Sequence, residues 1–209
     1  CLGRPERDMN FLDFNSYIEA LEKHSPTINI GSFIGTGAIK IAVKGFSNTP
    51  FTLKEMEMAK GYIQEAMDHG AFGISMGIMY VPECYSSTEE FVELAKVAAK
   101  KDRILACHIR GEGDSLITSI EEILTIAEKS GIPLEISHFK AAGKTNWGAK
   151  FGVAIDRIEA ARAKGMNVNV DFYPYTGGST TFLSLIPPSY MKATPDETAA
   201  YMGTNAGQR

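Results

Sequence analysis

Two histidines stand out as residues that could do chemistry. His108 and His138 lie near the ends of two successive runs of strand-forming residues, 104–109 and 134–139. Matching positions at the ends of neighbouring parallel strands bring two imidazoles within a few ångströms of each other, as a shared Zn²⁺ requires. Neutral imidazole is the commonest metal ligand in proteins. Two ligands do not hold a zinc ion, so this pattern predicts a metal site that needs at least one more donor.

Strand alternation makes a more specific prediction about these side chains. With a two-residue period, His108 shares a face with Ala106, and His138 shares a face with Leu134 and Ile136. Lys140 falls on the same predicted face as His138, and three roles are open for it. It is a solvated loop lysine, it binds a substrate carboxylate, or it forms a Schiff base as in barrel aldolases. The aldolase role leaves the paired histidines without a use.

The predicted elements that position these residues alternate between helix and strand. Thr52-Leu53-Lys54-Glu55 and Ser87-Thr88-Glu89-Glu90 read as capping boxes that open two of the helices. Helices are predicted at 9–24, 52–69, from 87, 114–131, 150–164 and from 194. Strands are predicted at 28–34, 72–76, 104–109, 134–139 and 168–172.

Alternating helices and strands indicate a parallel sheet, either a doubly wound sheet or a (β/α)₈ barrel. The doubly wound fold expects a glycine-rich phosphate loop, and Gly35-Thr36-Gly37 supplies only its first two glycines. The barrel expects polar residues at the carboxyl ends of its strands, which is where His108 and His138 fall. The barrel is therefore favoured.

Composition excludes several classes of function. The net charge of −4 argues against nucleic-acid binding. No apolar run approaches the roughly 18–20 residues of a membrane span, and the polar N-terminus does not resemble a signal peptide. Three cysteines without a CxxC motif fit a reducing, cytoplasmic location better than a disulfide framework or a cysteine-based structural zinc site.

Four blocks occur in an order that is specific to one family. They are GAFGISMGIMYVPECYSSTEEFVELAKVAAKK, CHIRGEGDSL, ISHFKAAGKTNWG and VDFYPYTGGSTTFLSLIPP. Together they closely resemble the N-acyl-D-amino-acid deacylases (D-aminoacylases) of the amidohydrolase superfamily. The resemblance implies a zinc-dependent enzyme that hydrolyses an N-acyl-D-amino acid to a D-amino acid and a carboxylic acid. In such enzymes the metal activates water and polarises the amide carbonyl.

The resemblance also implies roles for matching residues. His108 and His138 correspond to the metal-ligating histidines of strands five and six, and Lys140 to a lysine that holds the substrate's α-carboxylate. Tyr80, Tyr173 and Ser179 fall where the family places residues around the substrate.

Other parts of the family's site have no match in this chain. The remaining ligands are expected before its first residue, and the general acid/base aspartate is expected after Arg209, so no catalytic residue is assigned within the chain. Cys1 stands too close to the first predicted helix to be the family's cysteine ligand. Thr36 and Lys40 occupy positions where the family has histidine and arginine.

The expected structure is therefore a partial (β/α)₈ barrel with strands three to seven. Residues 1–209 are expected to form a single catalytic-domain fragment that binds small-molecule substrates but is inactive alone. Five strands cannot close an eight-stranded barrel, so self-association through exposed sheet edges is expected. Two alternatives stay open: a dihydroorotase-like cyclic amide hydrolase, and a non-catalytic α/β fragment.

Overall fold

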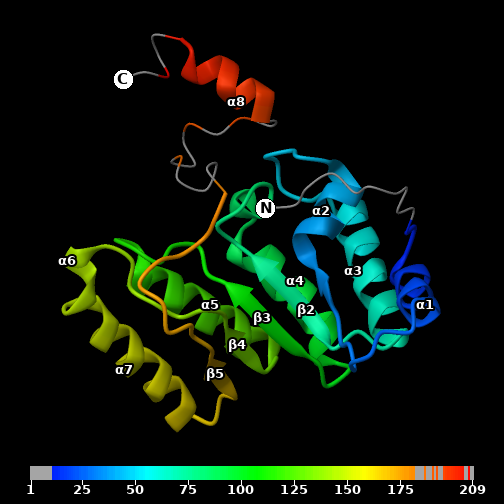
Figure 1. The fold of residues 1–209 in the computed structure, drawn as a ribbon, viewed down its shortest axis with the longest axis horizontal. Coiled ribbons are helices and arrows are strands. Elements are labelled where there is room, and N and C mark those ends of the chain that lie inside the picture. The colour runs from blue at the N-terminus through cyan, green and yellow to red at the C-terminus, as the bar shows by residue number, and fades with distance from the viewer. Residues whose placement is uncertain are drawn as a thin grey trace.

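The sheet contains five parallel strands in chain order, with helices between them (Figure 1). This architecture comes from a computed structural model, which describes residues 11–181, 186, 190, 192, 195–204 and 207. The strands are β1 (Phe33–Gly35), β2 (Gly73–Gly77), β3 (Ile104–His108), β4 (Leu134–Ile136) and β5 (Val168–Val170).

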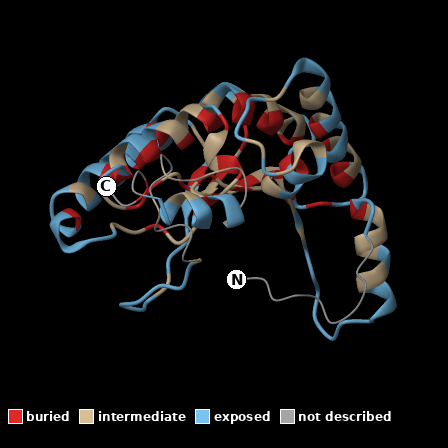
Figure 2. Ribbon diagram, turned by 90° about the horizontal axis from the view of Figure 1, so that it is seen from above, coloured by how far each residue is buried: buried red, intermediate tan, exposed pale blue. Residues whose placement is uncertain are grey.

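The helices form a layer on one face of this sheet. Helices α2, α3, α4, α5 and α7 contact one another in that order, and the two layers together form an arc (Figure 2). The described helices are α1 (Phe14–Lys23), α2 (Thr36–Lys44), α3 (Leu53–Asp68), α4 (Thr88–Ala99), α5 (Leu116–Ser130), α6 (Lys144–Trp147), α7 (Lys150–Ala163), α8 (Pro195–Met202) and the 3-10 helix η1 (Glu83–Tyr85). None of the helices within the described ranges is long and apolar enough to cross a lipid bilayer.

Local capping explains where several helices begin or end. Thr52 and Ser87 each accept a hydrogen bond from the backbone of a glutamate three residues on, which completes both predicted capping boxes. Helix α5 ends at Gly131, whose φ of 73° is the left-handed conformation that glycine adopts without strain. The predicted helices at 52–69, 114–131 and 150–164 agree with the observed bounds of α3, α5 and α7 to within a few residues.

The first predicted strand and the segment after it differ from expectation. Strand β1 begins at Phe33 rather than at Ile28, because its register with β2 starts at Phe33↔Gly73, and Ile28 remains 72% exposed. The glycine-containing segment after β1 forms helix α2, where no helix was predicted. The short elements η1 and α6 were also not predicted. The proposed cap of the last helix, Thr194, lies outside the described residues.

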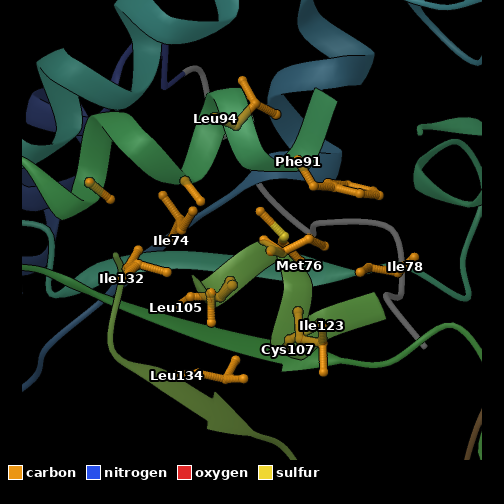
Figure 3. Packing of buried hydrophobic residues seen from close by; sticks show 14 of the residues in the cluster. Ile74, Met76, Ile78, Phe91, Leu94, Leu105, Cys107, Ile123, Ile132 and Leu134 are labelled. Carbon is orange, nitrogen blue, oxygen red and sulfur yellow. The ribbon is translucent and has the colours of Figure 1, made fainter. Parts of the chain in front are cut away.

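Alternate strand residues divide the sheet into a buried face and an open face. Ile74, Met76, Leu105, Cys107 and Leu134 pack against the helices and are at most 3% exposed (Figure 3). Their neighbours point to the opposite face and are more accessible, in the register Ala106↔Glu135↔Asn169. Most of the hydrophobic stabilisation therefore comes from one face, and the other is available for polar groups.

The single helical layer decides between the two candidate folds. A doubly wound sheet has helices on both faces, whereas a barrel carries them only on the outside. The five helices of the layer all lie on one face, and the sheet bends away from them (Figure 2). The predicted partial (β/α)₈ barrel is confirmed, with β1 and β5 as its two edges.

Candidate metal centre

The two histidines converge at the carboxyl ends of β3 and β4. His108 is the last residue of β3, and His138 follows β4 by two residues. His108 Nδ1 lies 2.8 Å from His138 Nε2, and the two ring centroids are 4.5 Å apart. At this distance, either one nitrogen carries a proton and donates it to the other, or both present lone pairs to a cation between them.

His138 reaches this position through a left-handed backbone conformation and not through strand alternation. The register pairs Cys107 with Ile136, so simple alternation after Ile136 would put His138 on the helix-covered face, opposite His108. Strand β4 ends at Ile136 instead, and His138 has a φ of 40°. The prediction that His138 and Lys140 share a face with Leu134 and Ile136 is therefore wrong.

Asp171 holds His138 in this conformation. Asp171 Oδ1 accepts a hydrogen bond from the His138 backbone N–H at 2.5 Å. A non-glycine residue with positive φ costs about 1–3 kcal/mol and persists only where its surroundings hold it. Such conformations cluster at functional sites, and here the strain places an imidazole beside a second one.

Burial keeps His108 in the form that binds metals. Burial lowers the pKa of His108 from 6.5 to about 4, so its ring is neutral at neutral pH. Its second nitrogen, Nε2, is buried and has no hydrogen-bond partner among the described residues. A neutral imidazole needs no deprotonation before it coordinates a metal.

Glu112 completes a group of three residues that could hold a metal ion. One potential ligand atom from each of His108, Glu112 and His138 lies within 4.8 Å of the others. Imidazole nitrogens and a carboxylate are donors that suit Zn²⁺. Nothing in the local sequence singled out Glu112, because it lies in the loop after β3 and has no periodic relation to either histidine.

Lys140 belongs to the same group and is not a solvated loop lysine. Its Nζ donates to Glu112 Oε1 at 2.5 Å and to the carbonyl oxygen of His138 at 2.9 Å. It also lies 5.4 Å from the centre of the Tyr173 ring. We call His108, Glu112, His138 and Lys140 the open cluster.

The open cluster lines a cavity of about 660 Å³. Tyr80, Tyr173 and Ser179 line it as well, so all four residues predicted to surround the substrate come together there. The Tyr80 ring lies 4.8 Å from that of His108, and its hydroxyl is 3.3 Å from Thr180 Oγ1. The cavity therefore combines a candidate metal group, one ammonium group and three phenols, since Tyr175 also lines it.

Arg110 does not join this cavity, although it follows His108 by two residues. Its guanidinium makes a bidentate pair with Glu122 on α5 and donates to the carbonyl oxygens of Cys84 and Ser86. Cys107 is buried on the helix-facing side of β3, and burial raises the pKa of its thiol. Cys1 lies outside the described residues.

A second polar cluster lies at the ends of β1 and β2, and it is sealed. Lys40 is 1% exposed and donates from Nζ to Ser86 Oγ at 2.6 Å. Thr36 Oγ1 contacts Glu83 Oε1 and the carbonyl oxygen of Ser75, and Glu83 Oε2 accepts from the Gly77 N–H at 3.0 Å. We call Thr36, Lys40, Glu83 and Ser86 the closed cluster, which includes the two positions that depart from the family pattern.

Two curated relatives match most of this chain. An N-acyl-D-glutamate deacylase of Alcaligenes xylosoxydans xylosoxydans is 32% identical over 173 residues, which is 83% of this chain and 35% of the relative. A D-aminoacylase of the same organism is 33% identical over 170 residues, 81% of this chain and 35% of the relative. The chain therefore spans about a third of the length of these relatives. No family model matches it.

Solved structures agree with these relatives. The N-acyl-D-glutamate deacylase of Bordetella bronchiseptica, complexed with zinc and a phosphonate inhibitor, has a TM-score of 0.77 and 32% identity over 79% of this chain and 35% of its own. A D-aminoacylase described as defining a novel subset of amidohydrolases also has a TM-score of 0.77, with 33% identity over 80% of this chain and 35% of its own. The resemblance seen in the four sequence blocks is thus confirmed: over about four-fifths of its length, this chain is a homologue of the D-aminoacylases and N-acyl-D-glutamate deacylases.

Proposed function

We propose that this chain forms part of the catalytic domain of a zinc-dependent hydrolase that cleaves the amide bond of N-acyl-D-amino acids. The observation that carries the proposal is the convergence of His108 and His138 at 2.8 Å, beside Lys140 in a cavity. Homology to deacylases, one of them solved with zinc, supports the choice of metal and of substrate class. The names of the relatives describe the substrates of those proteins. That this chain acts on the same class of substrate is part of the proposal.

Each residue of the cavity has a role in this proposal. His108 and His138 would hold the zinc ion, which when bound would polarise the amide carbonyl and activate water. Lys140 would bind the substrate's α-carboxylate with the ammonium donor that lies beside His138 Nδ1, because its other two donors bond to Glu112 and to the His138 carbonyl oxygen. The hydroxyl of Tyr80 or Tyr173 would donate a hydrogen bond to the developing oxyanion, and Ser179 would contact the substrate. We assign no general acid or base to the described residues.

We expect the chain alone to have little or no deacylase activity. Among the described residues, the candidate metal group offers only two histidines and one carboxylate, and one face of the sheet is open. An open site admits water and weakens every electrostatic interaction inside it.

A chimera tests the proposed function in a whole catalytic domain, separately from the question of whether this chain is active alone. The homologous third of a D-aminoacylase would be replaced by this chain, and hydrolysis of N-acetyl-D-amino acids would be measured with zinc present. We expect activity in the chimera, its loss in His138→Ala, and almost none in the isolated chain. A folded chimera without activity would contradict the proposed function, and robust turnover by the isolated chain would contradict the proposal that it is inactive alone.

We also propose that the chain self-associates through its sheet edges and resides in the cytoplasm. Phe33 and Phe72, near edge strand β1, are 37% and 58% exposed, and Val170 and Phe172, on and after β5, are 41% and 76% exposed. Apolar side chains beside unpaired strand edges favour association with another copy. Size-exclusion chromatography tests this, and a compact, stable monomer would count against it. The cytoplasmic location rests on the free thiols of Cys84 and Cys107.

A further inference from the structure

Glu112 is a single carboxylate that contacts both a candidate metal ligand and the candidate substrate-binding lysine. It is 9% exposed, and its Oε1 lies 3.1 Å from His138 Nδ1 and 2.5 Å from Lys140 Nζ. Its backbone carbonyl accepts a hydrogen bond from the Ala142 N–H at 2.7 Å, which ties the loop after β3 to the loop after β4. The position of Glu112 is therefore set by the same two loops that carry the site.

Two groups compete for the Nδ1 atom of His138. Lys140 Nζ lies 3.0 Å from this nitrogen, slightly closer than Glu112 Oε1 at 3.1 Å. If the ammonium donates to Nδ1, the ring's one proton lies on Nε2, and Nε2 cannot bind a metal. If Nδ1 carries the proton and donates to Glu112, Nε2 keeps its lone pair, which can accept a hydrogen bond from His108 Nδ1 or bind a metal.

The hydrogen bonds of Lys140 favour the second arrangement. Its ammonium already donates to Glu112 Oε1 at 2.5 Å and to the carbonyl oxygen of His138 at 2.9 Å, so it does not need Nδ1 as an acceptor. A carboxylate oxygen accepts more than one hydrogen bond, so Glu112 can serve Lys140 and His138 together. Glu112 also lies on the Nδ1 side of the ring, whereas Nε2 is the atom that faces His108.

We propose that Glu112 is a positioning residue that sets the tautomer of His138, so that Nε2 is free to bind a metal, and that anchors Lys140 beside it. The proposal rests on the proposed function for the identity of the metal, but the tautomer is a property of the protein alone. Carboxylates that orient a metal-bound histidine through its other nitrogen typically contribute about 10–100-fold to metal affinity. The substrate-binding lysine and the metal ligand would thereby share one anchor.

The tautomer can be read directly in the metal-free chain. Long-range ¹H–¹⁵N NMR would report which ring nitrogen of His138 carries the proton at a pH where the ring is neutral. We expect the Nδ1–H form in the wild-type chain, a shift toward Nε2–H in Glu112→Gln, and partial recovery in Glu112→Asp. Glu121→Gln is the matched control, because Glu121 pairs with Arg157 on the surface of α5. Lys140→Met should leave the Nδ1–H form in place.

Zinc titration supplies the second measurement. We expect Glu112→Gln to bind zinc about 10–100-fold more weakly than wild type and Glu121→Gln to bind it equally well.

Weaker zinc binding with an unchanged metal-free tautomer would overturn the proposal, since it would make Glu112 a direct ligand. Loss of the Nδ1–H form in Lys140→Met would overturn it too. If the wild-type chain binds no zinc, the proposed function fails, while the tautomer still tests Glu112. If Glu112→Gln does not fold, Glu112→Asp carries the same comparison.

Discussion

The open and closed clusters both lie beyond the carboxyl ends of the strands, yet only the open cluster could bind a ligand. Each contains one lysine and one glutamate at the carboxyl ends of parallel strands. In the closed cluster, Lys40 and Glu83 are 1% and 7% exposed and bond to neighbouring hydroxyl and backbone groups. In the open cluster, His108 and His138 face each other at the wall of a cavity.

The difference lies in how much hydrogen-bonding capacity remains for a ligand. Glu83 joins Thr36 to the backbone of β2 and so fixes the turn that leads to Tyr80. In the open cluster, His108 Nε2 has no hydrogen-bond partner among the residues that the structure describes, and two groups compete for His138 Nδ1. Polar residues at strand ends therefore do not by themselves make a site; unused donors or acceptors and space for a ligand are also needed.

The largest expected effect is on zinc binding by the open cluster. His108→Ala or His138→Ala should weaken zinc binding by more than the roughly 10–100-fold typical of losing a residue that only orients a ligand. Isothermal titration measures this, with His69→Ala as the control because His69 lies exposed at the end of α3. Unchanged zinc affinity in His138→Ala would show that the open cluster is no more a metal site than the closed one.

Thr36→Val should have a different effect, on folding rather than on binding. Thr36 is 2% exposed, and its loss leaves buried oxygens of Glu83 and Ser75 without their partner. The expected cost is about 1–3 kcal/mol in the free energy of unfolding, measured by chemical denaturation. Zinc affinity should not change, and a large change would mean that the closed cluster also takes part in metal binding.

The pKa of His108 predicts a dependence of stability on pH. Its value of about 4 in the folded protein lies below the 6.5 expected in the unfolded chain. Between these values the unfolded chain takes up a proton that the folded protein does not, so stability should fall as the pH is lowered from 7 to 4. His108→Asn should make this slope shallower than in wild type, whereas equal slopes would show that the ring is not held neutral.

The smallest expected effect is that of Glu83→Gln. Thr36 Oγ1 has one proton but two neighbouring oxygens, and a protonated Glu83 resolves the conflict by donating to Thr36. Burial raises the pKa of Glu83, which favours this neutral form. Glutamine can make the same bonds, so unfolding at pH 7 should change by no more than about 1 kcal/mol. A loss as large as that of Thr36→Val would show that Glu83 is ionised.

Much of the fold could be predicted because its signals are local. The capping boxes at Thr52 and Ser87 and the left-handed glycine at 131 each depend on a few neighbouring residues, and their helices were predicted closely. Strand β1 was misplaced because an apolar run such as 28–34 becomes a strand only where another strand pairs with it. Helix α2 was missed because its glycine-containing start resembles a loop.

The candidate site likewise contains some residues that local signals could identify and others that they could not. His108 and His138 could be named from residue type and strand position, and Lys140, Tyr80, Tyr173 and Ser179 from the family blocks. Glu112 could not be found, since its contact with Lys140 joins residues 28 positions apart in two loops. Strand periodicity also gave the wrong face for His138, because Asp171, from beyond the next strand, holds its backbone in a left-handed conformation.

Residue types and short-range spacing were thus sufficient for the class of fold, for the ends of several helices and for singling out the two histidines. The direction of each side chain, the partner of each charge and the separation of a sealed cluster from an open one depended on contacts between distant segments. The physical reason is that hydrogen-bond partners and burial are properties of the packed structure, whereas caps and periodicity are properties of neighbouring residues.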